Sequence, residues 1–242
     1  TLSTASEITT LPVANLQDRI VAKKWRSNAD LAPTVDLDLG AAHDVRVLAL
    51  AGCNLAAADT VRVRLSLTGA GNSDVLDTGA DASGVVDGYG FWLLVLAAAV
   101  SARWVRLDFA ASAPLTYVEA GRLWVGDAVQ PARNYGYGAA EQWNDDSIVQ
   151  RAPRSGAEYV ERGPKWRSWA FALPALTAAE GRGTVKELLR VAGISGQVLA
   201  VPDPDSAYAP KEALIGRLAR TQPIPHPHFD IRSAAFEVLE GL

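Results

Sequence analysis

Apolar residues alternate with charged or polar residues along several short segments of the chain. The clearest are residues 103–109, RWVRLDF, and residues 60–67, TVRVRLSL. Side chains of a β-strand point alternately to opposite faces, so this pattern predicts strands with one buried and one solvated face. Residues 91–100 are instead continuously apolar, which is typical of a central strand packed on both sides. The first half of the chain is therefore predicted to form a β-sandwich.

The second half has the pattern of antiparallel strands around one helix. Thr177 and Glu180 have the spacing of a capping box, and Gly193 supplies a stop, so a helix is expected over residues 177–192. In residues 165–173, Arg167 and Trp169 face opposite to their neighbours in the strand. Further strands are expected at residues 147–151, 157–161, 197–201, 213–221 and 229–239.

The chain is long enough for two domains. Its 242 residues accommodate two cores, and residues 126–138, with Pro131 and several glycines, interrupt the periodicity. We therefore place the boundary near Val129. The expected domains are residues 1–129, a β-sandwich, and residues 130–242, a mainly β domain with one helix.

The order of motifs in the first half resembles a known family. Trp25, Arg26 and Ser27 are followed by VDLDLG at 35–40, by two alternating strands, by ARWVRL at 102–107 and by EAGRLWVG at 119–126. This succession is similar to discoidin-type, galactose-binding-like jelly rolls, over most of residues 10–127. Two sequence segments, GCNL at 52–55 and YVEAGRL at 117–123, resemble the corresponding segments of jelly rolls in tailed-phage tail-tip proteins.

The second half resembles phage tail-tube-like domains, including the ring-forming domain of distal tail proteins. In many of those proteins the tube-like domain comes first, whereas here the order is reversed. The resemblance implies a structural virion protein of a tail tip or baseplate, made in the host cytoplasm. It implies a ring of copies of itself, six or three, that continues the tail tube, contacts other tail and baseplate proteins and displays the jelly roll outward.

Composition and charge narrow the functional classes. The formal net charge is -4, and neither half has the basic excess that nucleic-acid binding requires. The longest apolar run is about half the roughly 20 residues that cross a bilayer, and no signal peptide is expected at the start. Cys53 is the only cysteine, which excludes an internal disulfide and predicts a buried, inert thiol.

Candidate catalytic groups are few. His43 is expected in an exposed turn. His226 and His228 have a spacing that could place two imidazoles on one side of a strand to hold a metal, but a proline-stiffened lead-in is the favoured interpretation. Asp145 and Asp146 are interpreted as a turn. We therefore expect no enzymatic activity, no catalytic residue, no metal site and no cofactor.

Binding or assembly is the better expectation. A sugar ligand needs exposed aromatic, amide and carboxylate groups in loops at the ends of the sandwich. The loop candidates for this alternative function, reversible attachment to host-surface glycans, are Asn28, Asp30, Asn72, Asp74, Asp87 and Tyr89.

Contacts between copies would use the second half. Its large aromatic rings either cover a neighbouring subunit or fill this domain's own core, and its arginines either form ion pairs between subunits or lie on a solvated face. The candidates are Trp143, Tyr159, Trp166, Trp169, Arg151 and Arg154.

Overall fold

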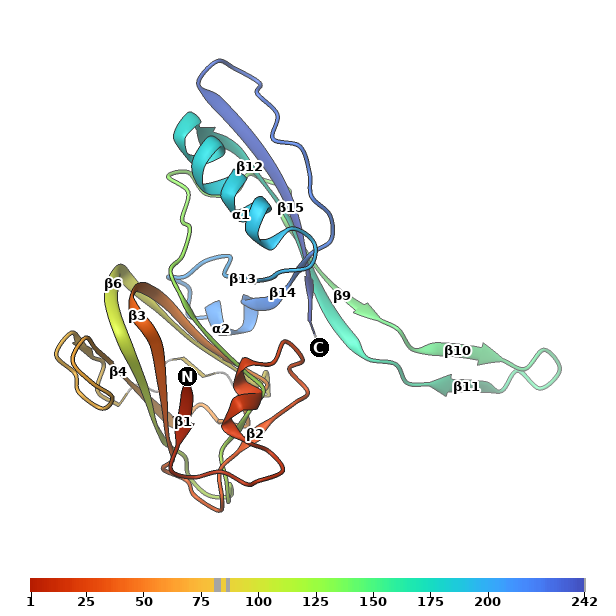
Figure 1. The fold of residues 1–242 in the computed structure, drawn as a ribbon. Coiled ribbons are helices and arrows are strands. Elements are labelled where there is room, and N and C mark those ends of the chain that lie inside the picture. The colour runs from red at the N-terminus through yellow and green to blue at the C-terminus, as the bar shows by residue number, and fades with distance from the viewer. Residues whose placement is uncertain (81–83, 86–87, 242) are drawn as a thin grey trace. The chain divides into compact units, whose positions relative to one another are not determined.

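The computed structural model describes residues 1–80, 84–85 and 88–241, and these residues are mainly β, as expected (Figure 1). The chain divides into two compact units, which we describe separately. The first comprises residues 1–128 and also residues 201–213, and the second comprises residues 129–200 and 214–242. The sequence placed the boundary at Val129. It contained no signal for the return of residues 201–213 to the first unit.

The first unit is a β-sandwich built on two long strands. Its elements are β1 (Leu2–Thr4), the 3₁₀ helix η1 (Val13–Gln17), β2 (Trp25–Arg26), β3 (Thr34–Ala51), β4 (Thr60–Ser66), β5 (Leu76–Asp77), β6 (Phe91–Ala110), β7 (Glu119–Ala120), β8 (Arg122–Gly126) and α2 (Ala209–Glu212). The main sheet has the order β1-β3-β6-β4-β5, with β8 also on β3, and β2 pairs with β7. The long strands β3 and β6 curve together (Figure 1).

Strands β3 and β6 contribute to both layers of the sandwich. The first part of β3 pairs with the last part of β6, beside β1 and β4, and the last part of β3 pairs with the first part of β6, beside β8. Register shifts separate these parts, between Asp38 and His43 and between Val45 and Val47. Such irregularities let a strand bend. Both parts supply one core, to which Val35, Leu48 and Trp92 belong.

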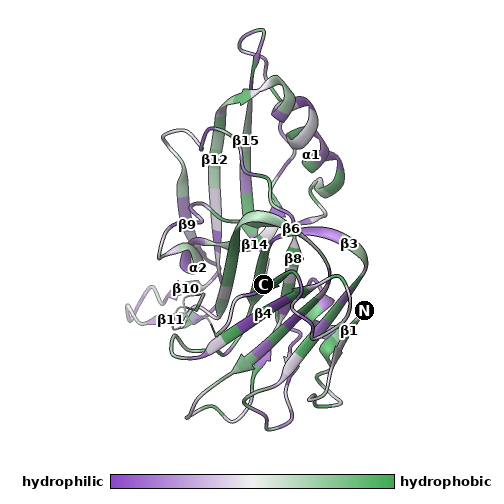
Figure 2. Ribbon diagram, turned by 90° about the vertical axis from the view of Figure 1, so that its left-hand side faces the viewer, coloured by the Kyte–Doolittle hydropathy of each residue, from purple (hydrophilic) through white to green (hydrophobic). Residues whose placement is uncertain are grey.

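Alternation along β4 explains how the core is filled. Val61, Val63 and Leu65 are fully buried, whereas Arg62 and Arg64 point away from the core, and the banding is visible in Figure 2. The outward arginines pair with carboxylates on neighbouring strands. The ion pairs on this outer surface are Arg62–Asp77, Arg64–Asp108, Arg106–Asp36 and Arg103–Asp38.

The second unit is one five-stranded antiparallel sheet with a helix on one face and a separate hairpin. Its elements are β9 (Ala140–Asp145), β10 (Ile148–Arg151), β11 (Glu158–Glu161), β12 (Lys165–Thr177), the π-helical segment η2 (Glu180–Val185), α1 (Lys186–Ala192), β13 (Gln197–Ala200), β14 (Leu214–Leu218) and β15 (Ile231–Glu240). The sheet order is β13-β14-β15-β12-β9, and β10 pairs with β11 alone. Strand β9 was not expected from the sequence.

The expected helix ends at Ala192 as predicted, but its first part differs: Thr177 is the last residue of β12, residues 180–185 are π-helical, and α1 begins at Lys186. The expected capping-box bonds are present. The backbone N–H of Thr177 donates to Glu180 Oε2 at 2.7 Å, and the backbone N–H of Glu180 donates to Thr177 Oγ1 at 3.2 Å. Gly193 ends the helix with a φ of 49°. Leu188 and Leu189 of the helix pack against the core of the sheet. No helix in the described ranges is long and apolar enough to span a membrane.

Asp38 makes the stability of the first unit sensitive to acid. Its carboxylate accepts hydrogen bonds from Arg103 Nε at 2.9 Å and from the backbone N–H of Gly40 at 2.8 Å, and these bonds lower its pKa to about 2. A carboxyl whose pKa is depressed by folding stabilises the fold above its unfolded pKa and loses that contribution as pH falls. We expect Asp38→Asn to flatten the decline in unfolding temperature between about pH 4 and about pH 2.

The matched control is Asp44→Asn, an exposed carboxylate that belongs to no ion pair among the described residues. Thermal unfolding followed by circular dichroism at each pH measures the effect. Equal acid sensitivity in wild type and Asp38→Asn would contradict the assignment.

Candidate functional site

The hairpin formed by β10, β11 and their connecting turn, residues 148–161, is called the arm from here on. It continues from the ends of β9 and β12 and extends away from the sheet of the second unit (Figure 1). All four residues of β10 and all four of β11 are exposed. The arm therefore has no hydrophobic core of its own.

Large apolar side chains nevertheless lie on the arm, on both faces. Val149 is directly opposite Val160, and Gln150 is opposite Tyr159. Since neighbouring residues point to opposite faces, Ile148 and Tyr159 share one face, and Val149 and Val160 share the other. Each of these four side chains is more than half exposed.

The six predicted contact residues of the second unit do not form one surface. Tyr159 and Arg151 lie on the arm, and Arg154 is exposed in its turn. Trp143, on β9, is exposed and lies under the guanidinium of Arg167, 5.6 Å from ring centroid to Cζ.

The other two tryptophans are held within the second unit. The indole N–H of Trp166 donates to Asp146 Oδ2 at 3.1 Å. Trp169 is 7% exposed and stacks on Phe171 with ring centroids 4.0 Å apart. Trp169 therefore fills the core of its own sheet, which corrects its selection as a contact residue.

The predicted ligand residues of the first unit that the structure describes lie in separate loops and do not form one site. Asn72 and Asp74 lie in the turn between β4 and β5, where both bond to Thr68 of the same turn. Asn28 and Asp30 lie in the connection before β3. The carboxylate of Asp30 accepts the backbone N–H of Ala32 at 2.9 Å. Asp87 lies outside the described residues.

Tyr89 has neighbours that the sequence did not indicate. Its ring is about half exposed, and Lys211 Nζ lies 5.2 Å from its centroid. The same ammonium lies 5.6 Å from the ring centroid of Tyr208, which is also exposed. Residues 201–213 return to the first unit from far along the chain, so no local pattern could have predicted this group.

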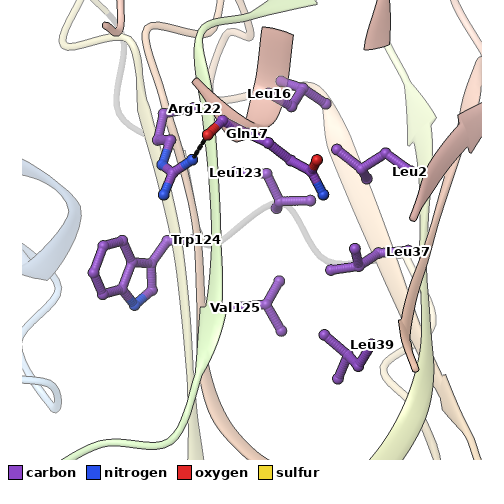
Figure 3. A pocket seen from close by; sticks show the side chains of 9 residues that line it. All are labelled: Leu2, Leu16, Gln17, Leu37, Leu39, Arg122, Leu123, Trp124 and Val125. Atoms are coloured by element: carbon purple, nitrogen blue, oxygen red, sulfur yellow. Dashed lines mark hydrogen bonds between the residues drawn. The ribbon is translucent and has the colours of Figure 1, made fainter. Parts of the chain in front are cut away.

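A hollow of about 400 Å³ lies beside β8 in the first unit (Figure 3). Leu123 and Val125 face leucines of β1 and β3 across it, whereas Arg122 and Trp124 lie on the opposite side of β8. Its lining residues are Leu2, Leu16, Gln17, Leu37, Leu39, Arg122, Leu123, Trp124 and Val125.

Six of the nine residues that line the hollow beside β8 are leucine or valine, and Arg122 is one of the other three. Arg122 Nη1 donates to the backbone carbonyl of Gln17, and burial lowers the pKa of Arg122. Arg122 Nε is buried with no hydrogen-bond partner in the described part of the chain.

The candidate catalytic groups do not converge. His43 is exposed on β3, where it pairs with Ala102, and not in a turn as expected. Asp145 is the last residue of β9, and its carboxylate accepts the backbone N–H of Ser147 at 2.9 Å. His226 and His228 are exposed in the connection between β14 and β15. Residues 1–80, 84–85 and 88–241 contain no group of three or more His, Cys, Asp or Glu arranged to hold a metal ion.

Comparison with solved structures finds proteins whose fold is similar to the β-sandwich of this chain. No family model and no curated protein matches the chain. A CBM32 module, CpGH89CBM32-6 of Clostridium perfringens, is 16% identical with a TM-score of 0.42, over 53% of this chain and 93% of that chain. The CBM32 of AlyQ, in complex with 4,5-unsaturated mannuronic acid, has the same identity and TM-score, over 53% and 95%.

A family 32 module of NanJ from C. perfringens, in complex with galactose, is also 16% identical with a TM-score of 0.42, over 52% of this chain and 91% of that chain. About half of the chain is therefore similar in fold to a discoidin-like, family 32 carbohydrate-binding module.

The thiol of Cys53 is predicted to be unreactive in the folded chain. Burial raises the pKa of its thiol to about 11. Because the thiolate is the reactive form, only about one thiol in a thousand is ionised at pH 8. We expect iodoacetamide at pH 8 to label the folded chain at least about a hundredfold more slowly than the chain unfolded in guanidinium. Labelling rates within tenfold of each other would contradict this environment.

Proposed function

We propose that this chain is a non-enzymatic structural subunit whose arm packs against neighbouring copies in a symmetric assembly. The observation that carries the proposal is the arm itself. An isolated two-stranded hairpin is at best marginally stable in water, yet this one presents four large apolar side chains to solvent. A partner surface would supply the burial that the arm lacks.

The energetic gain from such a contact is substantial. Burying one aliphatic or aromatic side chain fully contributes about 1.5–3 kcal/mol. The exposed apolar residues occupy both faces of the hairpin, so a partner that covered only one face would leave half of this gain unused. The arm is therefore suited to a groove, or to a position between two neighbours.

The proposed setting is the tail tip or baseplate of a tailed phage, within the virion. Support comes from the resemblance of both halves to tail-tip proteins. In this proposal the second unit forms a ring of copies, six or alternatively three, that continues the tail tube beside other tail and baseplate proteins. Closed rings of identical subunits repeat one contact by symmetry, so a modest arm contact is multiplied.

Removing the apolar surface of the arm is expected to break the assembly without unfolding the chain. The variant carries Ile148→Ser, Val149→Ser, Tyr159→Ser and Val160→Ser. Because these side chains are exposed, we expect its circular dichroism spectrum to match that of wild type. We expect its sedimentation to shift to the monomer between about 1 and 100 μM, a range that reports micromolar contacts.

The matched control is Val191→Ser with Ile194→Ser, which removes exposed apolar side chains elsewhere in the second unit. This control is expected to sediment as wild type does. A wild-type chain that is monomeric at every concentration and absent from purified virions would overturn the proposal.

A second candidate function is reversible attachment to host-surface glycans through the first unit. The exposed rings of Tyr89 and Tyr208 flank Lys211, with its Nζ 5.2 and 5.6 Å from their centroids. Exposed rings offer an apolar face to the C–H groups of a sugar, and an ammonium donates to its hydroxyls. This function is compatible with assembly through the arm.

Substitution of both rings tests the second candidate. We expect Tyr89→Ala with Tyr208→Ala to weaken binding to any retained host polysaccharide by at least about tenfold, the loss of roughly one good contact. Tyr137→Ala, which removes a fully exposed tyrosine from the second unit, is the control and is expected to bind as wild type does. A glycan array on which wild type retains nothing would exclude this function.

A further inference from the structure

A second hollow, of about 480 Å³, lies within the second unit. Its lining combines two guanidinium groups, two imidazoles, a proline and a phenylalanine. The residues are Arg182, His226, Pro227, His228, Phe229 and Arg232. Every charged or ionisable group in this lining is cationic or can become cationic, and no carboxylate takes part.

Arg232 is the unusual member of this lining. It is 3% exposed, and its Nη1 donates to the backbone carbonyls of His228, Phe229 and Ile231 at 3.3, 2.9 and 3.1 Å. Its Nε is buried without a hydrogen-bond partner in the described chain. No carboxylate among the described residues forms an ion pair with it. Arginine is rarely buried unless it is paired.

Arg167, the other buried arginine of the second unit, has a carboxylate partner. Arg167 is 5% exposed, and its Nη2 lies 2.6 Å from Glu240 Oε1. The sequence therefore compensates one buried guanidinium with a carboxylate and leaves the other to backbone carbonyls. The guanidinium of Arg232 therefore lies beside the hollow without a carboxylate partner among the described residues. A buried charge without an opposite charge is costly.

The backbone around Arg232 is shaped to hold it. A Cβ at Gly181 would lie 2.7 Å from both Cβ and Cγ of Arg232, so only glycine permits this approach. Gly181 and Arg182 belong to the π-helical segment η2. Such segments are rare and occur frequently at functional sites. This segment brings Arg182 to the same hollow as Arg232 from a separate element.

We propose that this hollow binds an oxyanion, a phosphate or carboxylate group. Guanidinium groups match the oxygens of both, and imidazole N–H groups add further donors. Asp230, the nearest acid along the chain, is exposed and is not part of the lining. The carbonyls around Nη1 hold Arg232 in place, while its charge remains available to the ligand.

The three histidines of the chain provide the test. His226 and His228 line the hollow, whereas His43 lies in the first unit and serves as an internal reference. Imidazole signals of the full chain are recorded by NMR during titration with sodium phosphate and, separately, with sodium acetate, at constant ionic strength and pH. His→Gln variants assign the signals. We expect saturable shifts of the His226 and His228 signals with an unmoved His43 signal.

Variants separate a built site from general charge effects. Arg182→Gln is expected to raise the dissociation constant at least about tenfold, as loss of a charge-assisted hydrogen bond does. Arg162→Gln, an exposed arginine outside the lining, removes the same charge and is expected to leave the constant unchanged. The anion with the lower dissociation constant, phosphate or acetate, identifies the ligand group as phosphate or carboxylate. The proposal is overturned if neither anion gives saturable shifts, if His43 moves equally, or if both arginine variants bind alike.

Discussion

The first unit depends on the pairing of β3 with β6 along nearly their whole lengths. The pairing runs from Thr34 opposite Asp108 to Ala51 opposite Phe91, through two register shifts. Because these two strands enter both layers, a slip of one residue would turn the inner side chains of both layers toward solvent. The ion pairs Arg106–Asp36 and Arg103–Asp38 join the same two strands on the outside and favour the observed register.

Sequence patterning predicted most strands because alternation reports burial directly. It identified residues 60–67 and 165–173, whose inward side chains are the buried ones. It divided β6 into two strands, residues 91–100 and 103–109, because the first is continuously apolar and the second alternates. It missed β9 because AEQWND is polar and mostly exposed. A strand held at the edge of a sheet by backbone pairing leaves little hydrophobic signal.

The candidate sites were less predictable, since they join residues that are far apart in the chain. Composition selected Tyr159 and Trp169 alike as contact residues, but one is exposed on the arm and the other is buried. Only the three-dimensional packing separates these outcomes. Lys211 beside Tyr89, and Arg182 beside Arg232, likewise depend on tertiary approach and leave no local pattern.

The arm and the two cores obey different constraints. Each unit closes a hydrophobic core without the arm, since neither core cluster includes a residue of β10 or β11. The apolar residues of the arm therefore do little for the stability of the monomer, and exposed hydrophobic surface carries an aggregation liability. The cross-strand pair of Val149 and Val160 stabilises the hairpin only modestly, and a partner surface would bury the apolar area that the pair leaves exposed. This difference between the cores and the arm supports the proposed assembly role.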